Sequence, residues 1–243
     1  MASVLGVAAL FAAGCAQEND GAPHLSPPDT ALSAAEVASE EARADSMLLT
    51  LDDFPDGWTA VPAAPEDRVR IDPADLARCV GAGDAPAIID LPHAATPTFV
   101  SPGGDAVIAQ VFLAPDDTDP RRMIDLLRDE AAPGCYAEGY QAAVDDLPAG
   151  EGFAADVELG TVTGVRLPYT PFGNTTVAWR ISIPLTVEHE NVNLYIDSVV
   201  TRVDRAIVSV TFQTQLRPYD RDGSERVTQI LVQRVTDAMS SAA

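Results

Sequence analysis

The chain has 243 residues, a formal net charge of −22 at pH 7 and a hydrophobic content of 47%. This length and hydrophobicity suit one sizeable domain with a tail, or two small domains. So strong a negative charge argues against nucleic-acid binding through phosphates. The charge is uneven, because residues 1–155 carry 27 acidic residues and 7 arginines, whereas residues 156–243 carry 10 and 8. An acidic first half keeps a protein soluble by repulsion, or it forms a surface that collects cations or a basic partner.

The N-terminus is typical of an exported protein. Residues 4–13 form an apolar run that is too short to cross a bilayer as a helix. Gly14, Cys15 and a polar stretch follow, in a pattern that resembles the bacterial lipobox. Residues 1–14 are therefore predicted to be a signal peptide. Cys15 is predicted to carry the lipid, palmitate included, that anchors the chain to the extracytoplasmic face of the cell membrane. Ala12 replaces the usual Leu and no basic residue precedes it, so an ordinary cleaved signal peptide or a chance apolar start stays open.

Residues 15–33 have the composition of a disordered linker, with Pro, Gly, Ser and Asp and few large apolar side chains. Such a linker would hold the domain away from the membrane. Ser33 followed by Glu36 three residues later matches a capping box. This pattern predicts a helix that runs to about Leu51, and it places the start of the envelope domain at residue 34, so that the domain covers residues 34–243.

The segments up to residue 146 are predicted to alternate between helices and a hairpin. An Asp-Pro pair at residues 72–73 places a cap before a proline at the first helical position, which predicts a short helix. Residues 96–100 and 106–113 are apolar, and the Pro, Gly and Asp residues between them are typical of a β-hairpin. A second Asp-Pro pair at residues 119–120 opens another helix, and one more short helix is expected after it.

The segment 157–216 is predicted to form the centre of the domain, because apolar and polar residues alternate along three stretches of it. The apolar residues of these stretches are Val177, Trp179, Ile181 and Ile183; Val192, Leu194 and Ile196; and Val208, Val210 and Phe212. Short loops at residues 189–190 and 204–205 separate the stretches, so the chain is expected to fold back twice into an antiparallel sheet with one apolar face. Arg180 then points to the opposite face, where we expect it to be a plain surface residue.

A C-terminal helix is predicted over residues 224–239, where apolar residues recur at helical spacing. We expect it to lie across the sheet face that carries Trp179, because both apolar surfaces need covering. The polar face is then left to solvent, or it forms one wall of a groove under the helices of the first half. The predicted fold class is α+β, a single domain with a central antiparallel β-sheet and helices packed on one face.

Cys79 and Cys135 each lie near the end of a predicted helix. In an exported chain a disulfide between them is the natural interpretation. A bond that closes a loop of this length stabilises a domain by about 4 kcal/mol in the chain-entropy model. A nucleophilic thiol would need a histidine partner, and a metal site would need further soft ligands.

Several of these features resemble a known family of actinobacterial envelope lipoproteins. They are Leu51, Phe54, Pro55, Gly57, Trp58, Cys79, Cys135 and the strand segments 199–202 and 208–210. Over roughly residues 46–240 they are similar to the extracellular sensor domain of the mycobacterial PknH-type receptor kinases and its free-standing lipoprotein relatives. The resemblance implies an α+β fold with a central antiparallel sheet, a groove beside it and no established reaction. The chain differs in having no kinase domain or transmembrane helix, and one cysteine pair where that sensor domain carries two.

The sequence holds few candidates for chemistry. It has no Gly-x-Ser-x-Gly elbow, no His-Glu-x-x-His and no phosphate-binding glycine loop. Its three histidines, His24, His93 and His189, fall in the linker, a loop and a turn; the carboxylates beside His189 allow a weak metal or pH-sensing site. Residues 116–119 and 220–225 have the carboxylate density of a calcium site without its spacing, so we expect helix caps and turn residues there. No catalytic residue, metal ligand or cofactor is predicted.

Trp58, Tyr136, Tyr140 and Trp179 are expected to be core residues. The sequence therefore predicts a non-enzymatic, membrane-anchored domain that binds a small envelope ligand or a protein partner in a groove beside the sheet. An envelope hydrolase with a carboxylate site built from distant residues, and a purely structural envelope protein, are the alternatives. A groove lined by apolar residues favours binding, whereas two converging buried carboxylates with raised pKa values favour catalysis.

Overall fold

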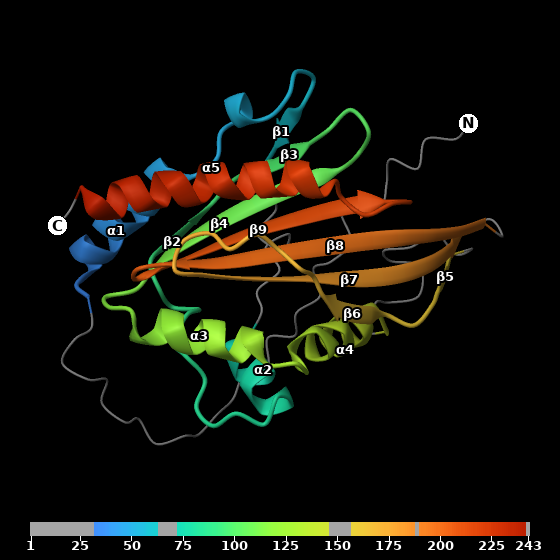
Figure 1. Cartoon of the computed structure of the whole chain (residues 1–243), viewed down its shortest axis with the longest axis horizontal. Coiled ribbons are helices and arrows are strands. Elements are labelled where there is room, and N and C mark those ends of the chain that lie inside the picture. The colour runs from blue at the N-terminus through green and yellow to red at the C-terminus, as the bar shows by residue number, and fades with distance from the viewer. Residues whose placement is uncertain (1–31, 63–71, 146–156, 188–189, 242–243) are drawn as a thin grey trace.

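The computed structural model describes residues 32–62, 72–145, 157–187 and 190–241. The predicted signal peptide, Cys15 and most of the predicted linker lie outside these ranges. The described residues form helices and the strands of one sheet (Figure 1). The elements in chain order are α1 (Ala34–Met47), the 3-10 helix η2 (Leu51–Asp53), β1 (Thr59–Val61), α2 (Pro73–Cys79), β2 (His93–Ala95), β3 (Thr98–Val100), β4 (Ala106–Leu113), α3 (Thr118–Arg128), α4 (Ala132–Asp145), β5 (Val157–Leu159), β6 (Thr163–Arg166), β7 (Thr175–Val187), β8 (Glu190–Val203), β9 (Ala206–Gln215) and α5 (Arg221–Ser240).

The strands form one antiparallel sheet in the order β1-β3-β4-β9-β8-β7-β5, with β2 also paired to β4 and β6 also paired to β7. The long strands β7, β8 and β9 follow one another in the chain and are direct neighbours in the sheet. The predicted double fold-back is therefore confirmed. Asp204, in the turn between β8 and β9, has a positive φ of 52°, a conformation that Asp adopts more readily than most residues. The predicted α+β class, with a large antiparallel sheet in a single domain, is also confirmed.

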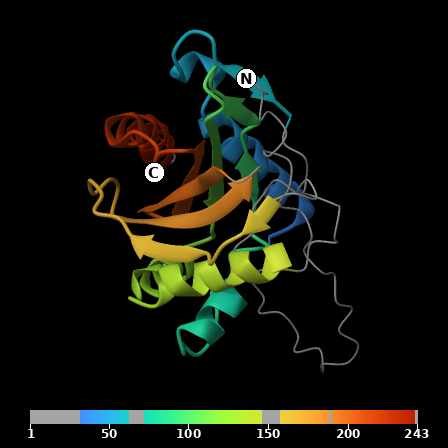
Figure 2. The ribbon, with the colours of Figure 1, turned by 90° about the vertical axis from the view of Figure 1, so that its right-hand side faces the viewer.

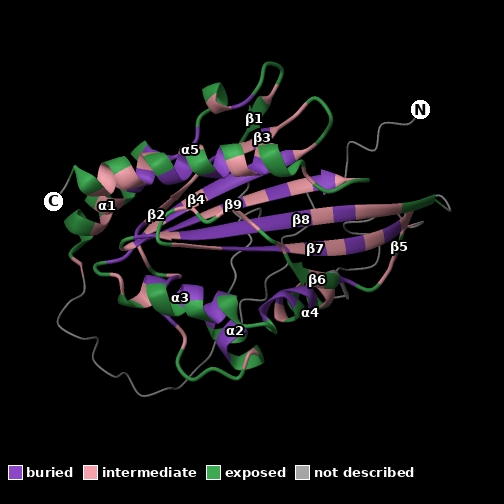
Figure 3. Ribbon diagram, in the orientation of Figure 1, coloured by how far each residue is buried: buried purple, intermediate pink, exposed green. Residues whose placement is uncertain are grey.

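Helices cover both faces of the sheet, as two views at right angles show (Figures 1 and 2). α1 and α5 pack on one face, and α2, α3 and α4 pack on the other. The apolar residues divide into two cores accordingly, one on each side of the sheet. Figure 3 shows that buried residues concentrate in the sheet and on the helix sides that face it. The expectation that helices pack on one face only is thus wrong.

The C-terminal helix lies on the face opposite to the one expected. Trp179 and Ile181 share a face and a core, as their alternation predicts, but that core includes α3 and α4. α5 instead packs against the face of Val208 and Val210. The reason is the register: Val177 lies opposite Val200, and Val200 lies opposite Ser209, so the apolar row of β9 points away from the apolar row of β7. The sheet is apolar on different faces in different strands, and each face therefore needs a helical layer.

Arg180 is not the plain surface residue that its alternation indicated. Its guanidinium donates two hydrogen bonds of 2.6 Å to the two carboxylate oxygens of Asp197 on the neighbouring strand. The Asp197 residue is 5% exposed. Arg180 also lies over the ring of Tyr195, with 5.6 Å between the guanidinium carbon and the ring centroid. The hydrogen bonds to Asp197 are the main cause that raises the pKa of Arg180.

The layer of α1 and α5 is held by local signals and by arginines. Ser33 and Glu36 form the predicted capping box at the start of α1, although the helix ends at Met47 and not near residue 51. Arg234 on α5 donates hydrogen bonds to the carbonyl of Leu48 and to both carboxylate oxygens of Asp53. These bonds join α5 to the end of the first helix. No helix in the described ranges has both the length and the apolar character needed to cross a membrane.

A glycine permits close contact between α4 and the sheet edge. Gly164 in β6 lies against the backbone of Pro133, in the first turn of α4, so closely that a methyl group at this position would overlap the Pro133 carbonyl. β6 pairs with β7, and Gly164 lies opposite Ile181. The position of α4 relative to the sheet, and thus the space between them, depends on this small residue.

Candidate ligand cavity

A cavity of about 90 Å³ lies between the sheet and the layer of α2, α3 and α4. Its floor is the sheet face that carries Trp179, across β4, β9, β8 and β7. The roof consists of Pro73 from α2, Met123 from α3, Tyr136 and Tyr140 from α4, and Ile88 and Ile89 from the loop after α2. The expectation that the face opposite Trp179 forms the groove wall is wrong: the cavity lies under helices of the first half, but its floor is the face that carries Trp179.

The centre of the floor is polar. Gln110 lies opposite Ser209, and Ser198 lies opposite Thr211 in the sheet register, with Gln213 next on the same face of β9. The side chains of these five residues make no hydrogen bond to another described residue, yet their polar atoms are open to solvent. Helices cover this face, where a sheet in an ordinary core carries apolar side chains. The five residues, named here the polar floor, thus present hydrogen-bonding groups beneath a helical layer that no described protein group pairs with.

Apolar side chains surround the polar floor. Those from the strands are Ile108, Phe112, Trp179, Val200 and Ile207. Trp179 is 2% exposed and stacks on Tyr136, with 4.8 Å between ring centroids and 10° between the ring planes. This stack closes the cavity on the side of α4. The prediction that both aromatic residues belong to the core is correct as to burial, but it missed that they also line a cavity.

Tyr136 has a hydroxyl without a hydrogen-bond partner among the described residues. The residue is 8% exposed, and burial raises the pKa of its phenol well above the usual range for tyrosine. Burial likewise raises the pKa of Tyr140 one helical turn further along. Both phenols are therefore neutral at physiological pH. Neither supplies a base to the cavity.

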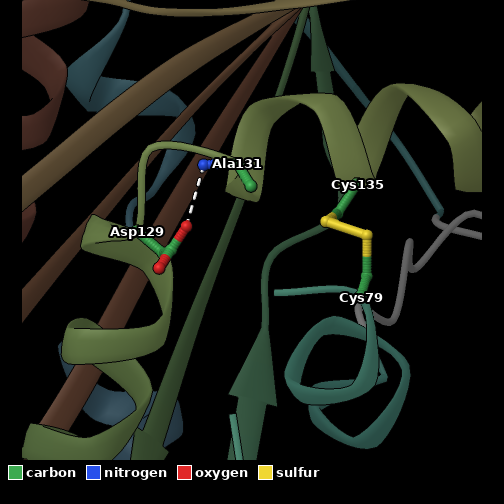
Figure 4. Close-up of a disulfide and its surroundings, with 4 residues drawn as sticks. All are labelled: Cys79, Asp129, Ala131 and Cys135. Atoms are coloured by element: carbon green, nitrogen blue, oxygen red, sulfur yellow. Dashed lines mark hydrogen bonds between the residues drawn. A yellow bond between two sulfur atoms is a disulfide. The ribbon is translucent and has the colours of Figure 1, made fainter. Parts of the chain in front are cut away.

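The disulfide between Cys79 and Cys135 joins two elements of the roof (Figure 4). Cys79 is the last residue of α2, Cys135 lies in the first turns of α4 beside Tyr136, and their Cα atoms are 5.9 Å apart. The bond predicted from the sequence is thus present in the structure. Nearby, the Asp129 carboxylate accepts a hydrogen bond of 2.8 Å from the amide of Ala131 at the start of α4. Together these contacts fix the roof helices to each other.

His93 lies at the rim of the cavity, next to Phe112 on the paired strand. Its Nδ1 is 3.0 Å from the carbonyl oxygen of Leu91. Because a carbonyl only accepts, Nδ1 carries the proton of this bond, and in the neutral ring Nε2 is an acceptor. The imidazole also stacks on Phe112, with ring centroids 5.2 Å apart.

The described residues that line the cavity include no carboxylate, guanidinium or thiol. His93 therefore has no acidic partner there, and the lining contains no acid–base pair. Within the described ranges no cluster of His, Cys, Asp and Glu could hold a metal ion. The two carboxylate-rich segments serve as expected, since Asp116 accepts from the amide of Thr118, and Asp220 accepts from the amide of Gly223 to cap α5. His24 and His189 lie outside the described residues.

One signal in the sequence could have located the polar floor. The residues Ser209, Thr211 and Gln213 alternate with apolar residues on β9, which marks them as one polar face. The pairing of β9 with β4 and β8 places this polar face on the same side of the sheet as Trp179. That side is covered by α2, α3 and α4. The cavity therefore depends on contacts between residues about a hundred positions apart, such as Gln110 and Ser209.

The fold and the cavity define an α+β domain with an antiparallel sheet between two helical layers. No family model and no curated protein matches the sequence. Among solved structures, the chain is similar to the extracellular domain of PknH from Mycobacterium tuberculosis, with 10% identity and a TM-score of 0.40 over 83% of this chain and 96% of that one. It is also similar to LpqN, involved in cell envelope biogenesis of M. tuberculosis, with 16% identity and a TM-score of 0.28 over 76% of this chain and 77% of LpqN.

A third similar structure is the ortholog of Rv0999 from Mycobacterium smegmatis, with 14% identity and a TM-score of 0.33 over 83% of this chain and 94% of that one. The extracellular domain of PknH, whose family the sequence motifs resemble, is among these structures. Identities of this size transfer no ligand and no partner to this chain.

Proposed function

We propose that this protein is a lipid-anchored domain on the extracytoplasmic face of the cell membrane, and that it binds a small envelope molecule in the cavity without catalysing a reaction. The observation that carries the proposal is the polar floor. Five polar side chains without a described hydrogen-bond partner lie under a helical layer, where apolar residues would give a more stable core. A bound molecule supplies the partners that the protein does not.

The chemistry of the lining supports binding over catalysis. A hydrolase needs a nucleophile or an activated water, together with a base that a third group orients. Among the described lining residues His93 is the one histidine, and its Nδ1 is already bonded to a backbone carbonyl. The described lining offers no carboxylate for the hydrolase alternative.

The proposed location rests on the N-terminal sequence and on the disulfide. Cys15 follows a short apolar run and small residues, as in a lipobox. A disulfide with one exposed cysteine, Cys79, persists in an oxidising compartment outside the cytoplasm. We expect Cys15→Ala to release the protein to the soluble fraction or to leave it unprocessed. Normal membrane retention of this variant would remove the lipid anchor from the proposal.

Binding is tested by native mass spectrometry on the full chain purified from its own membrane. We expect a bound molecule that is lost in Ser209→Leu, because a larger side chain at the centre of the floor fills the cavity. The matched control is Ser182→Leu, at a half-buried serine of β7 that points to the opposite face of the sheet. Both variants must keep the thermal midpoint of the wild type. A protein that carries no bound mass favours a purely structural domain, and the same bound mass in both variants would show that the molecule binds outside the cavity.

A further inference from the structure

The polar floor also defines what kind of molecule the cavity accepts. We infer that the ligand, or the part of it that enters the cavity, is compact, uncharged and rich in hydrogen-bonding groups, as a short polyol or a small amide is. This inference rests on the proposed binding function. It is drawn from three properties of the cavity: its charge, its floor and its size.

Charge excludes ions. No carboxylate, ammonium or guanidinium is among the described residues of the lining, the phenols of the roof are neutral, and the remaining ionisable group there is the imidazole of His93, which stacks on Phe112. An ion placed over the polar floor would lose its hydration without gaining a counter-charge from the floor or from the roof helices, which strongly disfavours its binding. The cavity therefore discriminates against phosphates, carboxylates and ammonium groups, although these are common on envelope molecules.

The floor disfavours an alkyl chain. Ser198, Ser209 and Thr211 present hydroxyls, which donate and accept, while Gln110 and Gln213 present amides. These groups have no described partner within the protein, so an acyl chain laid over them would strip them of water and leave them unbonded. A ligand with several donors and acceptors on one side replaces that water without this loss. The apolar residues around the floor then cover the carbon atoms of such a ligand.

Size limits what fits. A volume of about 90 Å³ corresponds to roughly six to nine water positions, at about 10–15 Å³ each. The cavity therefore admits a molecule, or a group at the end of one, with a similar number of non-hydrogen atoms. Larger ligands must leave most of their mass outside.

The test uses four probes of similar size on the full chain, with saturation-transfer NMR and titration. Glycerol is uncharged and polar, 3-amino-1,2-propanediol is its cationic analogue, glycerate is an anionic analogue, and 1-pentanol is apolar. We expect glycerol to bind and the other three to bind at least about tenfold more weakly. In the double variant Ser209→Ala/Thr211→Val we expect glycerol binding to weaken about tenfold, since two hydrogen bonds are lost. Ser182→Ala, on the other sheet face, should leave it unchanged.

The outcomes separate the two proposals. Preference for pentanol, or for either ion, overturns the inferred ligand class and leaves the binding function in place. The same holds if native mass spectrometry finds a charged molecule or an acyl chain in the cavity. If none of the probes binds and the native protein carries no bound mass, both proposals fail. Equal weakening in the double variant and in Ser182→Ala would show that binding occurs elsewhere and would overturn the assignment to the polar floor.

Discussion

The ion pair of Arg180 and Asp197 gives the sharpest test of the structure, because the sequence indicated an unimportant surface arginine. The pair links β7 to β8 through two hydrogen bonds of 2.6 Å. The Asp197 side chain is 7% exposed and that of Arg180 is 21% exposed. Asp197 lies on the face that α5 covers, opposite Phe212 of β9, which is fully buried. Arg180→Ala would leave this carboxylate without its partner.

The magnitude follows from that burial. Removal of one member of a buried ion pair costs about 3–5 kcal/mol, because the remaining charge is uncompensated. One fifth of the Arg180 side chain reaches solvent, so water entering the space left by it recovers part of this cost. We therefore expect Arg180→Ala to lower the free energy of unfolding by about 2–3 kcal/mol. A change within about 0.5 kcal/mol is what a surface arginine would give.

The assay is urea denaturation, with the slope against denaturant used to check that unfolding stays two-state. Arg78→Ala is the matched control, since Arg78 is also 2.6 Å from its carboxylate, Asp75, but both side chains are largely exposed. We expect that control to change stability by about 0.5 kcal/mol or less. The double variant Arg180→Ala/Asp197→Ala should be more stable than Arg180→Ala alone. Equal losses for Arg180→Ala and Arg78→Ala would refute the reasoning, because Asp197 would then be solvated.

Three further predictions concern the sheet, its edge and its phenols. Trp179→Ala should lower the free energy of unfolding by about 3–5 kcal/mol through lost burial and a cavity; a neutral result in urea denaturation would show that Trp179 is not packed between the layers. Gly164→Ala should cost about 1–3 kcal/mol, because its methyl group displaces Pro133 and α4; unchanged stability would mean that α4 lies further from β6. Burial raises the pKa of Tyr219 to about 12, and it also raises the pKa of Tyr140. Tyrosine ionises near pH 10 when unfolded, so stability present at neutral pH should fall as pH rises from about 10 through 12. The fall should be less steep in Tyr140→Phe, and an identical pH profile would contradict the assigned burial.

Local features of the fold could be predicted because each depends on neighbouring residues. The capping box at Ser33 and the cap with proline at residues 72–73 begin α1 and α2 where expected. The alternation along β7 identifies its buried row, and the turn at Asp204 ends β8 where polar residues interrupt the pattern. The pairing of Cys79 with Cys135 needed only the export signal and the count of cysteines. None of these inferences required knowledge of distant contacts.

The assignment of helices to sheet faces could not be predicted, because it depends on register. A shift of one residue in the pairing of two strands moves every side chain to the other face. The alternation of β7 and of β9 is visible in the sequence, but Val177 and Ser209 share a face only through their common neighbour Val200. The Arg180–Asp197 ion pair could not be predicted for the same reason, because its two residues are 17 positions apart in the chain and meet only through the pairing of β7 with β8. Non-local pairing therefore decided which face α5 covers.

The same register accounts for the cavity. If the apolar rows of β7 and β9 shared one face, a single helical layer would cover both, and the polar row of β9 would face solvent. With the rows on opposite faces, Val208 and Val210 pack under α1 and α5, and the row of Ser209, Thr211 and Gln213 lies beneath α2, α3 and α4. Apolar residues at these three positions would complete the second core and stabilise the fold by burial. Their polar identity therefore works against stability beneath a helical layer, and the proposed binding function rests on this feature.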